Sequence, residues 1–133
     1  MTSPAWRWIK ESAVLAIHEE QVAEHGGLHG IRDVAMLQSA LARPQHIEAH
    51  GNPDAADLAA AYAVGVARNH PFLDGNKRAA WVVAETFLLK NGYKLIANDR
   101  DGVTTMLAVA DGTMSEPEFA LWLRTYMRPS AMK

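Results

Sequence analysis

The chain has 133 residues, the length of one ordinary domain, and we expect a single domain over residues 1–133. It contains no cysteine, which excludes thiolate catalysis, cysteine zinc sites and a disulfide scaffold and fits a reducing compartment such as the cytoplasm. Its 13 Lys and Arg against 15 Asp and Glu give a net charge of −2, so the chain as a whole has no attraction for nucleic acid or for an anionic membrane.

No segment of the sequence has the pattern of a membrane anchor or a leader. The most apolar stretch, Leu58–Ala67, is too short to span a bilayer. Met1–Pro4 lack the basic and then apolar order of a signal peptide. We therefore expect a cytoplasmic protein with no membrane contact and no direct nucleic-acid partner.

The first half of the chain predicts two helices separated by a glycine-rich turn. Apolar side chains recur every three to five residues over residues 10–25, and Gly26 ends this helix. Asp33 can cap a second, short helix that ends before Pro44, because proline interrupts a helix. Residues 45–51 have no period and are expected to form a loop or flap.

The second half predicts further helices and almost no strand. Asn52-Pro53-Asp54 is a helix start, and this helix is expected to reach Asn69 before a loop at residues 70–74. Three more helices are expected at residues 75–91, at residues 100–111 and from the Ser115 capping box onward. Apart from a brief alternation at residues 93–96, the pattern predicts an all-α protein, a compact bundle of about six helices.

The loop between the two central helices concentrates the chemistry of the sequence. It carries an imidazole, a carboxylate, an amide and two cations, in the string His70-Pro71-Phe72-Leu73-Asp74-Gly75-Asn76-Lys77-Arg78. The free N–H groups in the first turn of a helix bind anions, and a glycine lets a bound group approach the backbone closely. The turn that begins near Gly75 therefore predicts a phosphate site, to which Lys77 and Arg78 add full positive charges.

Three side chains of this loop have separate expected roles. Asp74 has the wrong charge for phosphate, and we expect it to hold a divalent cation that bridges phosphate oxygens. His70 can accept the proton of an attacking hydroxyl near neutral pH. Phe72 is expected to be a buried anchor that fixes the loop. The plainer interpretations are a helix cap for Asp74 and solvated surface charges for Lys77 and Arg78.

The string resembles the motif of the Fic/Doc family, in its Doc form H-x-F-x-[DN]-[AG]-N-K-R. All seven defined positions match without a gap. Flanking segments also look like those of Doc-type toxins, namely residues 26–33, 39–44 and 91–93. The resemblance implies the Fic fold, as one Fic/Doc domain of this chain's length and helical layout.

The Doc form of the motif implies kinase chemistry. Members of the Fic branch move AMP from ATP to a protein hydroxyl, using a glycine and a distal arginine where Lys77 and Trp81 stand in this chain. Similarity to the Doc branch implies the reversed outcome: the γ-phosphate of ATP passes to a threonine of elongation factor Tu and translation stops. A lysine beside the phosphoryl group fits that outcome, because it stabilises the charge of the transition state.

The resemblance also assigns roles to individual residues and partners. It implies His70 as the catalytic base, Asp74 as the Mg²⁺ ligand, and nucleotide phosphate contacts from Gly75, Asn76, Lys77 and Arg78. It further implies a Phd-type antitoxin, whose C-terminal segment folds as a helix in a groove of the toxin. A flap that aligns the target is also implied, and residues 45–51 are the candidate by position.

Two other functions stay open from the sequence alone. The same site could transfer AMP instead of phosphate, or the chain could be a helical binding module with a degenerate site. Trp6 and Trp8 either pack on the core or stay exposed for a partner helix.

Outside the loop, structural roles are expected. His18, His25 and His29 are interpreted as helix-surface histidines rather than as a metal cluster. Arg32 and Asp33 are interpreted as an ion pair combined with a helix cap.

Overall fold

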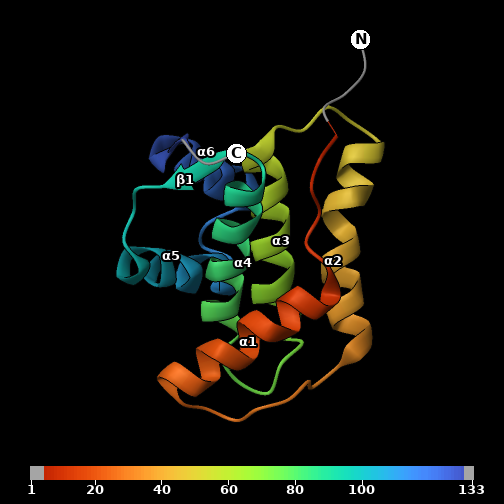
Figure 1. The fold of residues 1–133 in the computed structure, drawn as a ribbon, viewed down its shortest axis with the longest axis vertical. Helices are drawn as coiled ribbons and strands as arrows, with labels where there is room; N and C mark the ends of the chain where they lie inside the picture. Colours follow the sequence, from red (N-terminus) through yellow and green to blue (C-terminus); the bar gives the residue numbers. More distant parts are fainter. Residues whose placement is uncertain (1–4, 131–133) are drawn as a thin grey trace.

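The computed structural model describes residues 5–130, which form six helices and a two-stranded sheet (Figure 1). The elements in chain order are α1 Glu11–His25, α2 Val34–Ala49, α3 Ala55–Asn69, α4 Asn76–Lys90, β1 Tyr93–Leu95, α5 Asp99–Asp111, α6 Glu116–Tyr126 and β2 Met127–Pro129. The predicted all-α bundle is confirmed. None of the helices in residues 5–130 is long and apolar enough to cross a membrane. The expectation about a leader concerned Met1–Pro4, which lie outside the described residues.

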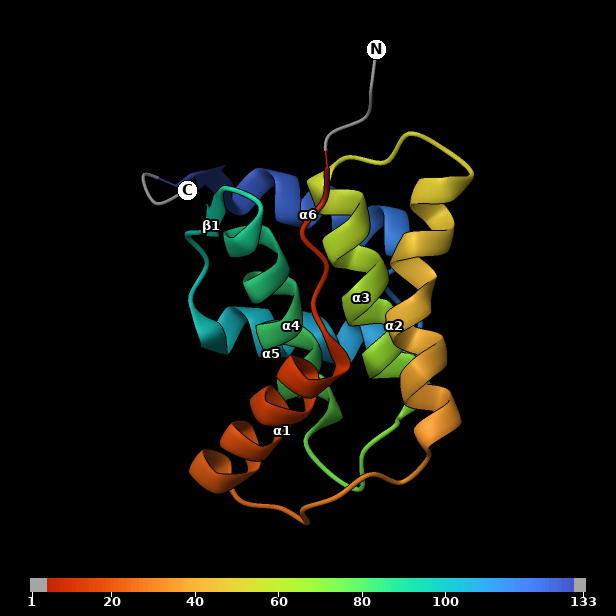
Figure 2. The ribbon, with the colours of Figure 1, turned by 45° about the vertical axis from the view of Figure 1, so that its right-hand side comes forward.

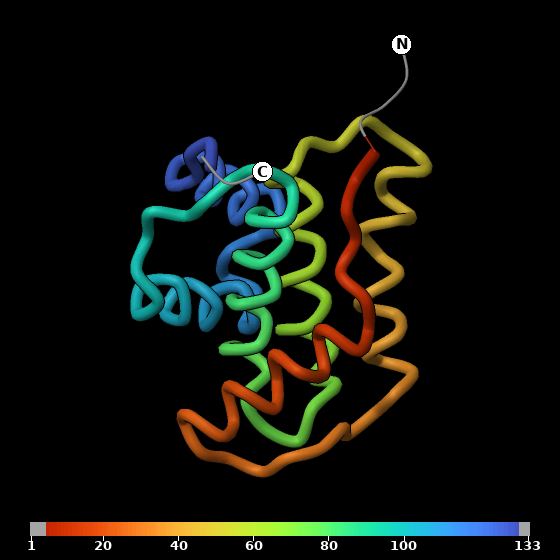
Figure 3. The backbone as a smooth tube through the Cα atoms, in the orientation of Figure 1, coloured from red at the N-terminus to blue at the C-terminus, as the bar shows by residue number. Residues whose placement is uncertain are grey.

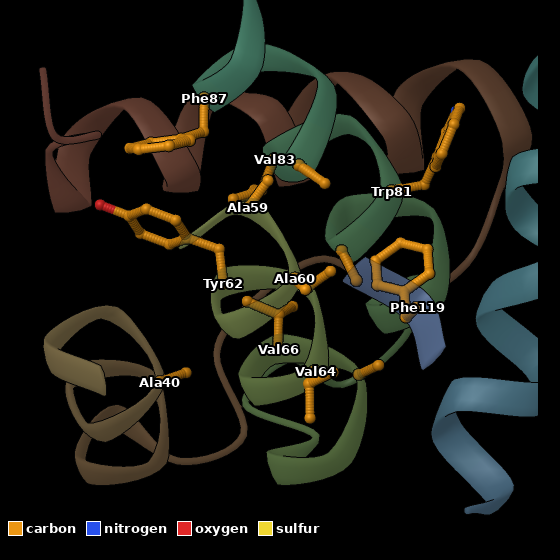
Figure 4. Close-up of a cluster of buried hydrophobic side chains, with 14 of the residues drawn as sticks. Ala40, Ala59, Ala60, Tyr62, Val64, Val66, Trp81, Val83, Phe87 and Phe119 are labelled. Carbon is orange, nitrogen blue, oxygen red and sulfur yellow. The ribbon is translucent and has the colours of Figure 1, made fainter. Parts of the chain in front are cut away.

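α3 forms the centre of the bundle, because most of the side chains that it carries are small and let other helices pack against every face. Its buried residues include seven alanines, which favour a helix and allow neighbouring helices to approach closely. α2 comes so near that a Cβ placed on Gly65 would lie 3.0 Å from the Cβ of Ala40. Larger side chains fill the space between the helices; the ring of Tyr62 lies 5.3 Å from that of Phe87 on α4 (Figure 4).

α1 lies across one end of α4, as Figures 1 and 2 show. The extended segment before it packs on the core, since the rings of Trp6 and Trp8 lie 6.2 and 6.0 Å from the ring of Phe87. After α1 the chain passes beside the turn between α3 and α4 before it enters α2 (Figure 3). This crossing brings α1 and residues 26–33 to the loop at residues 70–75.

α2 is longer than the sequence predicts. The helix continues through Pro44 to Ala49, so the expected loop at residues 45–51 is largely helix. Proline removes the hydrogen bond that position 44 would donate to the carbonyl of Ala40, a local cost that favours a break. Pro44 is nevertheless buried in the helix, and packing of this face offsets the missing bond. The prediction was wrong because it used only the local preference of proline.

Two smaller differences concern caps and strands. Asp54, not Asn52, caps α3, and its carboxylate shares a capping box with Asp57. The alternation at residues 93–96 does form a strand, β1, which pairs antiparallel with β2. No pattern in the sequence had indicated β2.

α4 and α5 are joined by the ring of Trp81. Its indole N–H donates to Asp99 Oδ1 at 3.0 Å, and the residue is fully buried. A Cβ on Gly102 of α5 would lie 2.2–2.4 Å from three atoms of this ring. Gly102 is therefore required by the close approach of the ring and not by its backbone conformation.

We expect Gly102→Ala to destabilise the fold by about 1–3 kcal/mol, because the added methyl overlaps the Trp81 ring. In an ordinary helix interior the same change stabilises by about 0.5–1 kcal/mol. Urea unfolding followed by circular dichroism gives the free energy. Thr104→Ala, an exposed position of the same helix, is the control and should shift it by less than about 0.5 kcal/mol. A Gly102→Ala protein as stable as the unsubstituted chain would contradict this packing.

Candidate functional site

The loop of residues 70–75 lies against residues 26–33, which come from the connection between α1 and α2. Ile31 and Phe72 form an antiparallel bridge, in which the Arg32 N–H donates to the Pro71 carbonyl at 2.7 Å and the Leu73 N–H donates to the Gly30 carbonyl at 3.1 Å. Two segments about forty positions apart in the sequence therefore form one short ribbon at this end of the bundle.

Asn76 holds the loop from inside. Its side-chain Oδ1 accepts from the Phe72 N–H and its Nδ2 donates to the Phe72 carbonyl, both at 3.0 Å. The residue is only 6% exposed. Its side-chain amide thus bonds to the loop backbone, whereas the sequence had indicated only a phosphate contact for Asn76. Nδ2 also lies 3.3 Å from His70 Nδ1.

His18 holds the same turn from α1, a role that the sequence analysis missed. It is buried rather than exposed, and its Nε2 lies 2.7 Å from the Asp74 carbonyl oxygen. Its ring stacks on Phe72 with 3.8 Å between centroids and 5° between planes. A signal was available, because His18 stands four residues from both Val14 and Val22, the other buried positions of α1.

His70 occupies a strained position. It is the C-cap of α3 with φ 49° and ψ 54°, and it is the one residue other than glycine with positive φ in residues 5–130. Arg32 supports it, donating from Nε to the His70 carbonyl at 2.6 Å and from Nη2 to the Asn69 carbonyl at 2.9 Å. The predicted cap of α2 by Asp33 is confirmed, since its carboxylate accepts from the Met36 N–H, whereas the predicted Arg32–Asp33 ion pair was wrong. His70 is exposed, so a group in solution can reach it.

Asp74 has one carboxylate oxygen in use and one available. Oδ2 accepts from the Leu28 N–H at 2.7 Å, and Gly27 passes so close that a Cβ there would lie 3.1 Å from the Asp74 Cβ. In residues 5–130 no group of three or more His, Asp or Glu side chains could hold a metal ion. Mg²⁺, however, commonly uses one or two carboxylates together with phosphate oxygens and water. Asp74 therefore fits such an ion when a phosphate is bound beside it.

The first turn of α4 presents unpaired N–H groups to a pocket. The first helical bond runs from the Ala79 N–H to the Gly75 carbonyl, and within residues 5–130 the N–H groups of the four residues before Ala79 have no acceptor. A pocket of about 450 Å³ lies at this turn, lined by Gln21, Val22, His25, Gly26, Gly27, Asp74, Gly75, Lys77, Arg78 and Val103. Two cations in the first turn oppose the helix dipole, which a bound anion would relieve. The pocket is thus suited to a phosphate group.

A second pocket, also of about 450 Å³, continues this one between α1, α4 and α5. The two share four lining residues, Gln21, His25, Arg78 and Val103. Trp81 and Asp99 line the second pocket, and Glu85 of α4 lies close enough to Asp99 for their charges to interact. Burial, and secondarily the charge of Asp99, raises the pKa of the Glu85 carboxyl to about 7. The two pockets together therefore form one groove that starts at the first turn of α4.

Replacement of Glu85 should change the pH dependence of stability. The pKa of a free glutamate is 4.5 and that of Glu85 is raised to about 7, so folding favours the protonated form and stability falls as pH rises between these values. Glu85→Gln should therefore unfold like the unsubstituted chain at pH 4 and be more stable at pH 8, by about 1–2 kcal/mol after allowance for residual exposure. Thermal unfolding at both pH values measures this. Equal stability at pH 8 would show that Glu85 ionises freely.

Residues 45–51, which were predicted to be a flap beside the site, do not lie near it. Residues 45–51 lie at the end of α2 that is distant from the loop of residues 70–75 (Figures 1 and 2). The segment beside the loop is instead residues 26–33, and three apolar side chains there and in the loop are exposed, namely Leu28, Ile31 and Leu73. In residues 5–130, the N–H and C=O of Ile31 have no hydrogen-bond partner. The expectation for residues 45–51 was wrong because it required Pro44 to end α2.

Comparison with known proteins gives three related findings. The family model described as Fic/DOC family matches residues 8–88, a range that includes the loop and most of α4. The chain is 46% identical over 77 residues to the toxin Doc of Mycolicibacterium smegmatis, a match that covers 55% of this chain and 58% of that protein. It is 33% identical over 90 residues to the protein kinase doc of Escherichia phage P1, which covers 67% of this chain and 71% of the phage protein. The chain thus matches less than two thirds of the length of the first relative and more than two thirds of the second.

Proposed function

Since the chain belongs to the Fic/DOC family, we propose that it is a Doc-type toxin that transfers the γ-phosphate of ATP to a protein hydroxyl. The observation that carries the proposal is the cradle of four unpaired N–H groups, Lys77 and Arg78, which opens beside Asp74. The exposed His70 does not line this pocket, but its Nδ1 lies 3.3 Å from Nδ2 of Asn76 in the first turn of α4. Such an arrangement stabilises a phosphoryl group by position and charge. The names of the relatives, a toxin and a protein kinase, support the same proposal.

The residues of the site have distinct tasks in this reaction. His70 accepts the proton of the target hydroxyl, and the hydroxyl oxygen forms a bond to the γ-phosphorus. The bond between that phosphorus and the bridging oxygen breaks, and ADP leaves with this oxygen. The N–H groups of the first turn, with Lys77 and Arg78, hold the non-bridging oxygens. Asp74 Oδ1 is the group that would hold Mg²⁺, which supplies positive charge between the phosphates when bound.

The neighbourhood of Trp81 favours transfer of phosphate over transfer of AMP. In the Fic branch an arginine at this position grips the distal phosphates, but Trp81 is buried and its only donor is bonded to Asp99. Beyond Arg78 the groove is lined by the acidic Glu24 and Asp99 and by one further cation, Arg100. The triphosphate end is better held at the motif, and the nucleoside then extends along the groove.

The target segment is best placed at the outer edge of residues 28–31. Ile31 offers a free N–H and C=O, to which an extended peptide can add as a strand. This edge belongs to the ribbon that pairs with the motif loop, so an added strand would lie on the far side of residues 28–31 from that loop. We propose a threonine of elongation factor Tu as the acceptor, a Phd-type antitoxin as the neutralising partner and the cytoplasm as the place of action.

Mass spectrometry of the acceptor protein tests the reaction directly. Elongation factor Tu incubated with the chain, ATP and Mg²⁺ should gain about 80 Da on a threonine, the mass of one phosphoryl group. A gain that matches AMP would instead establish nucleotidyl transfer. No change on elongation factor Tu, with a labelled band in a whole lysate, would overturn the choice of target and keep the chemistry.

Two substitutions should abolish the transfer and leave the fold intact. His70→Ala removes the base, which typically contributes about 10²–10⁴ in rate. Asp74→Asn keeps an oxygen that can accept from the Leu28 N–H but removes the charge that Mg²⁺ needs. Growth after induction and the phosphate gain are measured for both, with circular dichroism as the check on folding. A folded His70→Ala protein that remained fully active would exclude His70 as the base.

Lys77→Gly tests the choice between phosphate and AMP. The substitution restores the glycine of the Fic branch and removes a positive charge from the pocket. We expect loss of phosphoryl transfer, measured with γ-labelled ATP. Label from α-labelled ATP is followed in parallel, and its appearance on the target would show that this residue selects the chemistry. Unchanged phosphoryl transfer would contradict the role given to Lys77.

A further inference from the structure

The turn from Phe72 to Asp74 is held by the two buried polar side chains of residues 5–130, His18 and Asn76. Asn76 belongs to the motif, but His18 belongs to α1, more than fifty positions earlier in the chain. Burial of a polar ring is unfavourable unless it is hydrogen-bonded, and a leucine would fill the same space at lower cost. The use of histidine at this point needs a reason beyond packing.

The peptide unit between Asp74 and Gly75 supplies that reason. The C=O and N–H of a planar trans peptide point in opposite directions, and no peptide bond of residues 5–130 is cis. His18 Nε2 lies 2.7 Å from the Asp74 carbonyl, which can only accept, so Nε2 carries the proton and donates. This bond draws the carbonyl toward α1. It thereby turns the Gly75 N–H, the first of the four unpaired N–H groups, away from the His18 ring.

Stacking adds a second constraint on the same turn. The ring of His18 lies nearly parallel to that of Phe72, 3.8 Å away, and both residues are about 1% exposed. The space is tight, since a Cβ on Gly75 would lie 3.8 Å from two atoms of the His18 ring. The side chain of His18 thus contacts both the Phe72 ring and the peptide unit between Asp74 and Gly75, and it fixes both.

We propose that His18 is a positioning residue of the site, which fixes the direction of the Gly75 N–H and the position of Asp74 through its bond to the Asp74 carbonyl. This inference rests on the proposed function for its kinetic consequence. Its geometric content, the direction of one peptide unit, stands apart from the identity of the reaction.

Two substitutions separate the hydrogen bond from the stacking. His18→Phe keeps a flat ring against Phe72 and loses the donor. His18→Gln places an N–H near the position of Nε2 and loses the ring. If the bond positions the site, His18→Phe should lower kcat by about 10- to 100-fold, the usual loss when a supporting residue is removed, and His18→Gln should retain most of the activity. Stability should follow the opposite order, with His18→Gln the less stable of the two by thermal unfolding.

Val14→Ala is the matched control, because Val14 is buried one turn earlier on the same face of α1 and has no side-chain donor that could bond to the loop. It should lower the melting temperature and leave kcat unchanged. A purely structural role for His18 would make activity follow stability across all three variants. Equal activity of His18→Phe and the unsubstituted chain would overturn the proposal.

Nuclear magnetic resonance gives a readout that needs no catalysis. The imidazole ¹⁵N shifts of His18 should report a proton on Nε2, and the Gly75 amide signal should move in His18→Phe and stay near its original position in His18→Gln. If the unsubstituted chain transfers no phosphate but these signals behave as stated, the proposed function fails and the positioning role holds. Gly75 signals that are the same in both variants would overturn the positioning role whatever the reaction is.

Discussion

The clamp on the backbone between Phe72 and Asp74 is the constraint on which the rest of the site depends. His18 and Asn76 together satisfy the Phe72 N–H, the Phe72 carbonyl and the Asp74 carbonyl. Each of these groups would cost about 1–3 kcal/mol if it were buried without a partner. A different conformation of this turn would lose these bonds, so the observed conformation is favoured. It fixes where α4 begins and which of its N–H groups stay unpaired.

The packing of the helices brings the residues of this clamp together. The alanines of α3 let α2 and α4 pack closely on either side of α3, so the loop between α3 and α4 starts from a rigid base. The crossing of α1 over the end of α4 delivers His18 from one side and residues 26–33 from the other. Arg32 then holds the carbonyl of His70, whose positive φ is the local strain that turns the chain out of α3. Strain at a functional residue is thus balanced by contacts made elsewhere.

Local signals in the sequence were sufficient for most of the helices and for the motif. Caps, glycine stops and apolar spacing predicted both ends of α1, α4 and α5, and the start of α6, to within a residue or two. They failed at Pro44, where packing of a buried helix face outweighed the preference of proline for a break, and at β2, which exists only because β1 is there to pair with it. Neither outcome can be derived from the segment itself.

The residues of the site likewise include some that the sequence could identify and some that it could not. The residues that belong to the motif could be named from the sequence, because they are adjacent in it. His18 and Arg32 could not be assigned, since their roles depend on how α1 and residues 26–33 are folded back onto the loop. The spacing of His18 with Val14 and Val22 did indicate the buried face. It could not indicate that a carbonyl of the distant loop would lie within reach of Nε2.

A crystal structure of the His70→Ala protein with Mg²⁺ and a non-hydrolysable ATP analogue tests the central claim most directly. The account predicts that the terminal phosphate lies on the unpaired N–H groups of Gly75 to Arg78, that Mg²⁺ contacts the free oxygen of Asp74, and that the Asp74 carbonyl remains bonded to His18. An α-phosphate in that cradle, with the terminal phosphates beside Trp81, would contradict the proposed phosphoryl transfer.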